Sequence, residues 1–276
     1  MRRGAVLLLA GLALLTAGAG SAPGRPLVAA HRGGAALWPE NSLLAFRNAL
    51  GLGVEYVETD VHLSADGQVV VMHDPTLERT STGVGALRER TLADLEAVRL
   101  RARDGSVGDE RVPTLARLLD LLAPSPVGLL LEIKVDHRKQ RYPGIEEKVL
   151  ALLRAHGMQQ RTLVMAFERE TVRRVRELDP SVRTALLIGR GELQRDRVRP
   201  AEGVARAREL GAAAIGYNHR LVDDEVVAAA RAAGVVLGAW TVNEEADIRR
   251  MMAAGVDLII SDRPDLVRRL VGPARP

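Results

Sequence analysis

The 276-residue chain contains no cysteine, and this absence excludes several classes of protein. Without thiols there can be no disulfide framework, no thiolate-ligated zinc site and no lipid-modified cysteine. Aromatic residues are also scarce, at 3%. The hydrophobic core must therefore be built from Ala, Val, Leu and Ile, and stability must come from aliphatic packing.

Lysine is rare as well, because the chain has only Lys134, Lys139 and Lys148. The formal net charge of +4 comes from arginines spread along the whole sequence. No basic cluster or arm of the kind that follows a phosphate backbone is present. We therefore expect no nucleic-acid partner.

The N-terminal stretch MRRGAVLLLAGLALLTAGAGSAPG has the order of a secretory signal peptide. Two arginines precede an apolar run over 5–16, and small residues follow that suit cleavage after Ala19 or Ala22. The alternative is an uncleaved membrane anchor, but the run is shorter than the about 20 apolar residues that a spanning helix needs. We predict a signal peptide over 1–22, a secreted or periplasmic protein, and no stable membrane insertion after cleavage.

Short apolar runs alternate with helical stretches through the rest of the chain. The runs are continuous, as in strands buried on both faces of a parallel sheet. In order, they are 27–31, 56–61, 129–133, 162–166, 184–188, 213–216, 235–240 and 258–260. Eight such strands separated by helices predict a single (β/α)8 TIM barrel over 26–272.

A doubly wound open sheet is the competing architecture. No glycine-rich phosphate fingerprint of the form G-x-G-x-x-G follows a strand, which counts against it. The region 74–112 breaks the alternation with turn-rich sequence, a short helix over 91–99 and the polar stretch RARDGSVGDE. We expect this region to be a short insertion between the second strand and its helix.

In such a barrel, functional residues lie at the C-terminal ends of the strands. Glu58 and Asp60 are two residues apart, as are Glu132 and Lys134, so each pair shares one face of its strand. Buried carboxylates repel one another unless a cation intervenes, and oxygen ligands suit a hard ion. We predict that Glu58, Asp60 and Glu132 bind one divalent cation, Ca²⁺ by preference and Mg²⁺ as the alternative. A set of salt bridges with Arg32 and Lys134 remains the other interpretation.

Two histidines flank this group. His31 ends the first strand, and His73 ends the run VVVMH, which can pair back beside the second strand. One histidine can accept a proton from a nucleophile while the other protonates a leaving group. Arg32 can bind a phosphate in bidentate fashion, and Gly33 and Gly34 let backbone amides approach an anion. Together these residues predict phosphoryl chemistry.

Other polar residues have simpler interpretations. Asn41 precedes the apolar positions of PENSLLAF and is interpreted as a helix cap. His62 is expected to point away from Asp60 by strand alternation. Trp240, at the end of the seventh strand, either belongs to the core or forms a wall of the substrate site. The remaining histidines are expected to lie outside the site: His137, His156 and His219.

The charged residues lie within stretches that resemble the glycerophosphodiester phosphodiesterases, which are metal-dependent TIM-barrel enzymes. The stretches are AHRGGAALWPENSLLAF, GVEYVETDVHLSADGQVVVMHDPTLERTSTG, VPTLARLLDLL, LLLEIKV, LGAWTVN and GVDLIISDRP. The resemblance implies hydrolysis of a small-molecule glycerophosphodiester to glycerol 3-phosphate and an alcohol. The implied roles are acid/base catalysis for His31 and His73, metal binding for Glu58, Asp60 and Glu132, and phosphate binding for Arg32 and Lys134.

Two other functions remain open. A lysophospholipase D-type enzyme would use the same site on lysolipids, and a non-catalytic binding barrel would use it without turnover. The sequence shows no charged group evidently directed at the leaving alcohol, so we expect the enzyme to be strict for glycerol and tolerant of the head group. The residues do not determine the oligomeric state.

Overall fold

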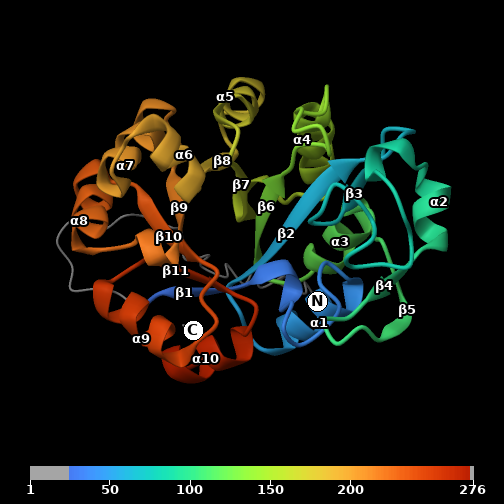
Figure 1. The fold of residues 1–276 in the computed structure, drawn as a ribbon, viewed down its shortest axis with the longest axis horizontal. Coiled ribbons are helices and arrows are strands. Elements are labelled where there is room, and N and C mark those ends of the chain that lie inside the picture. Colours follow the sequence, from blue (N-terminus) through green and yellow to red (C-terminus); the bar gives the residue numbers. More distant parts are fainter. Residues whose placement is uncertain (1–24, 274–276) are drawn as a thin grey trace, which may run out of the picture.

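The computed structural model describes residues 25–273 as a barrel surrounded by helices (Figure 1). The predicted signal peptide over 1–22 lies outside the described residues. None of the helices in the described range combines the length and hydropathy that a membrane span requires.

Eight parallel strands form the barrel in this range. They are β1 (Leu27–Ala30), β2 (Tyr56–Leu63), β6 (Gly128–Ile133), β7 (Thr162–Ala166), β8 (Arg183–Ile188), β9 (Ala214–Asn218), β10 (Val236–Trp240) and β11 (Leu258–Ser261). The sheet closes because β1 pairs with both β11 and β2. The predicted (β/α)8 barrel is therefore confirmed, and the open sheet is excluded.

The helices pack around the outside of the barrel (Figure 1). They are α1 (Leu43–Gly51), α3 (Leu115–Leu122), α4 (Ile145–Ala155), α5 (Arg169–Leu178), α6 (Arg190–Asp196), α7 (Pro200–Glu209), α8 (Asp224–Ala233), α9 (Glu245–Ala254) and α10 (Pro264–Val271). In α3, the buried residues are Leu115, Leu118, Leu119 and Leu122, the spacing of one helix face. Glycines end α8 and α9 in the left-handed conformation, as expected for C-caps.

The core has two layers, and both are mainly aliphatic. The larger layer lies between the strands and the helices, and a smaller cluster fills the barrel interior. Tyr56 is a rare aromatic in the interior, and Gly128 makes room for it: a Cβ at position 128 would lie 2.4 Å from the Tyr56 ring. The packed interior closes the barrel below the strand ends, so a ligand can bind only at the mouth.

The region between β2 and α3 forms its own small layer beside the mouth, at the right of Figure 1. It contains β3 (Val69–Val71), which pairs antiparallel with β2, followed by α2 (Leu92–Ala97), β4 (Arg99–Arg101) and β5 (Val107–Arg111). The β3 pairing and the short helix were expected. The β4–β5 hairpin was not, because β5 is largely exposed and has no apolar face to predict it.

Short 3-10 helices connect several of these elements. They are η1 (His31–Gly33), η2 (Leu87–Glu89), η3 (Gln159–Arg161) and η4 (His219–Leu221). The first of them, η1, directly follows β1 and places its side chains at the mouth of the barrel.

Candidate active site

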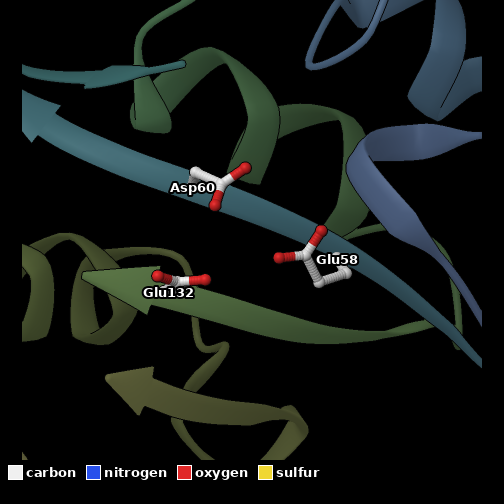
Figure 2. Close-up of side chains that lie close together, drawn as sticks. All are labelled: Glu58, Asp60 and Glu132. Atoms are coloured by element: carbon white, nitrogen blue, oxygen red, sulfur yellow. The ribbon is translucent and has the colours of Figure 1, made fainter. Parts of the chain in front are cut away.

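Three carboxylates converge at the mouth of the barrel (Figure 2). Glu58 and Asp60 extend from β2, and Glu132 extends from the adjacent strand β6, where it pairs in register with Asp60. All three residues are buried, and one oxygen of each lies within 4.8 Å of the others. The structure thus brings together the predicted ligand set.

Two cations lie against this cluster. Lys134 Nζ is 2.7 Å from Glu132 Oε1 and 3.3 Å from Asp60 Oδ1, and Arg32 Nε is 3.5 Å from Asp60 Oδ2. Burial alone would raise the pKa of Asp60, but Lys134 and other nearby cations hold it well below its ordinary value. The salt bridges that formed the alternative interpretation therefore exist, and they keep Asp60 ionised.

Glu58 is left without such compensation. Its carboxylate accepts a hydrogen bond of 2.8 Å from the backbone of Arg32, and within the described chain its one ion pair is with His31 Nε2, at 3.9 Å. Burial, followed by the charge of Asp60, raises the pKa of Glu58 well above its ordinary value. The cluster thus has three carboxyl groups and two cations, and the charged form of Glu58 is disfavoured while no further cation is bound. A divalent cation with oxygen ligands fits this arrangement.

His31 is oriented by a residue from the opposite end of the sequence. Its Nδ1 lies 2.5 Å from Oδ1 of Asp262, which follows β11, while its Nε2 faces Glu58. Asn243 Nδ2 donates a hydrogen bond of 2.8 Å to the other oxygen of Asp262. Sequence reasoning missed Asp262, although the rule that functional residues follow strand ends applies to it.

His73 is oriented in a similar way. Its Nδ1 lies 2.6 Å from Oδ1 of Asp74, and Arg79 donates to both oxygens of Asp74. Arg79 also forms a bidentate pair with Glu40, which accepts a hydrogen bond from Arg32. This network links His73 to Arg32, the residue predicted to bind the phosphate. The sequence analysis did not predict roles for Asp74 and Glu40, although Asp74 directly follows His73 and Glu40 directly precedes Asn41.

His62 is closer to the site than expected. Residues two apart on a strand share a face, so alternation gave no reason to point His62 away from Asp60. The buried His62 ring lies 3.2 Å from the carbonyl oxygen of His73 and 2.9 Å from the Tyr142 hydroxyl. Burial lowers the pKa of His62 to about 4, so the ring is neutral near pH 7. Its contacts support the backbone of His73.

The helix-cap interpretation of Asn41 was wrong, and the expectation that backbone amides approach an anion does not hold for Gly34. Ser42, not Asn41, caps α1, because its side chain accepts a hydrogen bond of 3.0 Å from Ala45 N. Asn41 is buried and donates to Asp60 Oδ2 at 3.0 Å, so it helps to position a predicted metal ligand. The amide of Gly34 donates to the carbonyl of His31 at 2.8 Å and is not available to an anion.

A cavity of about 100 Å³ lies over these groups. Trp240 belongs to its wall, with its ring edge-on to Phe167 at 5.8 Å between centroids. Trp240 Nε1 is buried and has no hydrogen-bond partner in the part of the chain that the structure describes. Of the predicted site residues, Asp60 lies beneath the cavity surface, and the others line it: His31, Arg32, Glu58, His73, Glu132, Lys134 and Trp240. The cavity thus combines proton-transfer groups, cations and carboxylates around a small apolar wall.

Comparison with known proteins gives a consistent result. Residues 31–266 match the model of the glycerophosphoryl diester phosphodiesterase family. The glycerophosphodiester phosphodiesterase of Caldanaerobacter subterraneus subsp. tengcongensis is 32% identical over 248 residues, which cover 90% of this chain and 98% of that protein. A crystal structure from Agrobacterium tumefaciens superposes with a TM-score of 0.83 at 29% identity, covering 90% of this chain and 98% of that one.

A further solved structure has a ligand. It is an Oleispira antarctica phosphodiesterase in complex with the product sn-glycerol-3-phosphate, with a TM-score of 0.77 and 27% identity, covering 89% of this chain and 96% of that one. The family match spans most of the chain and includes all of the clustered residues described above. The chain therefore belongs to the glycerophosphoryl diester phosphodiesterase family.

Proposed function

We propose that the protein hydrolyses glycerophosphodiesters to glycerol 3-phosphate and an alcohol, in a reaction that requires one divalent cation. The observation that carries this proposal is the pair of carboxylate-oriented histidines, His31 with Asp262 and His73 with Asp74, at a cluster of three carboxylates. The Oleispira antarctica neighbour, solved with sn-glycerol-3-phosphate as its product, supports the same assignment.

Glu58, Asp60 and Glu132 would hold the cation. An all-oxygen ligand set favours a hard ion, and we propose Ca²⁺ first and Mg²⁺ second. When bound, the ion supplies Lewis-acid polarisation of a phosphoryl oxygen. The presence of three carboxyl groups beside only two cations, Lys134 and Arg32, supports this assignment over salt bridges alone.

The chain's own side chains supply the other elements of the reaction. Lys134 and Arg32 stabilise the charge that develops on the phosphoryl oxygens. One histidine of the pair His31 and His73 accepts the proton of the attacking hydroxyl, and the other protonates the departing alkoxide. The attacking hydroxyl is that of a water molecule, which gives glycerol 3-phosphate directly, or the free glycerol hydroxyl next to the phosphate. In the second case the alcohol departs from a cyclic glycerol phosphate, which water then opens to glycerol 3-phosphate. Trp240 contributes to the wall against which the glycerol lies.

The test is turnover of glycerophosphocholine by the purified protein with added Ca²⁺. We expect glycerol 3-phosphate and choline in equal amounts, measured by an enzyme-coupled assay and mass spectrometry. A lysophosphatidylcholine hydrolysed much faster than glycerophosphocholine would favour the lysophospholipase D-type function. Cation binding without turnover of either substrate would favour the binding barrel.

We also propose that the protein is exported. The proposal rests on the sequence over 1–22, with its basic start, apolar run and small residues. The intact mass of protein recovered from periplasm or medium should correspond to a chain that begins after Ala19 or Ala22. A full-length chain retained in the cytoplasm would contradict the proposal.

Asp262 should act as a positioning residue for His31. We expect Asp262→Asn to lower kcat by about 10- to 100-fold with a small change in KM, because the amide no longer fixes the ring as the carboxylate does. Steady-state kinetics on glycerophosphocholine would measure both constants. Asp265→Asn is the matched control, since Asp265 pairs with Arg263 at the start of α10. If Asp262→Asn and Asp265→Asn lowered kcat equally, Asp262 would not act by positioning His31.

A further inference from the structure

A second cavity, of about 460 Å³, adjoins the catalytic one. The two cavities share His31, Arg32 and Thr241 in their linings. The reacting phosphate must lie near His31 and Arg32, so a substituent on that phosphate can extend from one cavity into the other. The smaller cavity, of about 100 Å³, suits the three-carbon glycerol. The larger one is then left for the alcohol that departs.

Half of the residues that line the larger cavity come from the insertion after β2. We call it the hairpin cavity, because residues of the β4–β5 hairpin line one side of it. Its lining residues outside the shared set are Ala35, Glu40, Arg79, Thr80, Arg101, Ala102, Arg103, Gly105 and Asp262.

The acidic residues of the hairpin cavity already have side-chain partners. Glu40 accepts hydrogen bonds from both Arg32 and Arg79, at 3.0 and 2.8 Å. Asp262 lies against His31. Both carboxylates are therefore already engaged by other side chains of the chain.

Two arginines of the cavity have no acidic partner. The guanidinium of Arg101 contacts backbone carbonyls alone, those of Gly105 at 3.4 Å and Ser81 at 3.3 Å. For Arg103, the described residues provide neither a hydrogen bond nor an ion pair. The hairpin cavity thus has an excess of positive charge on one wall.

The backbone that carries these arginines is anchored to the rest of the insertion. Arg101 N donates to the carbonyl of Thr80 at 2.8 Å, and the adjacent Leu100 is buried in the small core of the insertion. The arginine side chains therefore extend from a fixed base. Guanidinium groups match phosphate and carboxylate oxygens in bidentate geometry.

We infer that the hairpin cavity is a subsite for the leaving alcohol and selects alcohols that carry negative charge, such as a second phosphate group. This inference rests on the proposed function. It differs from the expectation that no charged group faces the leaving alcohol. A single exposed ion pair contributes little, so the selectivity arises when Arg101 and Arg103 bind one anion together.

The experiment compares two diesters at saturating Ca²⁺ and about 0.1 M salt. Glycerophosphoglycerol releases neutral glycerol, whereas bis(glycerophospho)glycerol releases an alcohol that retains a phosphodiester. We expect kcat/KM per terminal glycerophosphate to be about tenfold higher for the second substrate. Since the Debye length falls from about 10 Å at 0.1 M to about 3 Å at 1 M salt, the preference should shrink at high salt.

The double variant Arg101→Gln/Arg103→Gln should lose the preference and hydrolyse glycerophosphoglycerol within about twofold of the wild-type rate. The matched control is Arg99→Gln/Arg111→Gln, on the same hairpin but outside the cavity lining. This control variant should keep the preference for bis(glycerophospho)glycerol. A wild-type protein without the preference, or a double variant that keeps it, overturns the inference alone. A wild-type protein that hydrolyses neither diester overturns the proposed function as well.

Discussion

Replacing His31 with Ala should lower kcat for glycerophosphocholine by about 10²-fold or more, and His73→Ala should do the same, because each substitution removes one of the two proton transfers. The effect should fall on kcat more than on KM, since each ring is directed at the reacting groups by a carboxylate, Asp262 for His31 and Asp74 for His73. Single-turnover and steady-state rates of glycerol 3-phosphate release measure it.

The matched control is His156→Ala. His156 caps the C-terminal end of α4, far from the strand ends that form the mouth, and its Nδ1 lies 2.7 Å from the carbonyl oxygen of Leu152. His156→Ala should leave kcat within about twofold of the wild-type value. A double variant of His31 and His73 that retains wild-type turnover would remove the acid/base assignment, provided that its circular dichroism spectrum shows the native fold.

Chelation should abolish turnover, and Ca²⁺ or Mg²⁺ should restore it. Loss of several kcal/mol of charge stabilisation at the phosphoryl group corresponds to about 10²-fold or more in rate. Glu58→Gln should weaken cation binding, because it removes one of the three carboxylate ligands. It leaves the pairs of Lys134 with Asp60 and Glu132 in place, because Glu58 takes no part in them. Isothermal titration calorimetry with Ca²⁺ and with Mg²⁺ measures the affinity and ranks the two ions.

The stability of Glu58→Gln distinguishes a metal site from a cluster of ion pairs that only stabilises the fold. Burial raises the pKa of Glu58 well above its ordinary value and so disfavours its charged form, and the neutral amide should leave the metal-free protein as stable as the wild type, or more stable. Thermal unfolding in EDTA tests this. Asp66→Asn is the control for cation binding, since Asp66 is exposed in the turn before β3. Full activity in thoroughly chelated wild-type protein would contradict the metal site.

The sequence determined by itself the features that depend on local periodicity. Continuous apolar runs predicted the eight strands, and each observed strand begins and ends within two residues of its predicted range. The spacing of Glu58 from Asp60, and of Glu132 from Lys134, placed each pair on one face because side chains alternate along a strand. Charged residues at strand ends then predicted a single mouth, since parallel strands of a barrel all end at the same face.

The partners of those residues depended on the tertiary structure. Asp262 orients His31 although 231 positions separate them, and they meet only because closure of the barrel pairs β1 with β11. Arg79 links Asp74 to Glu40 across the insertion, and the polar hairpin brings Arg101 and Arg103 to the second cavity. Local patterns specify which face a side chain occupies, but they contain no information about which distant loop will lie beside it. The catalytic and metal-binding candidates could be identified from the sequence, whereas their supporting contacts and the alcohol subsite were decided by how the loops pack at the mouth.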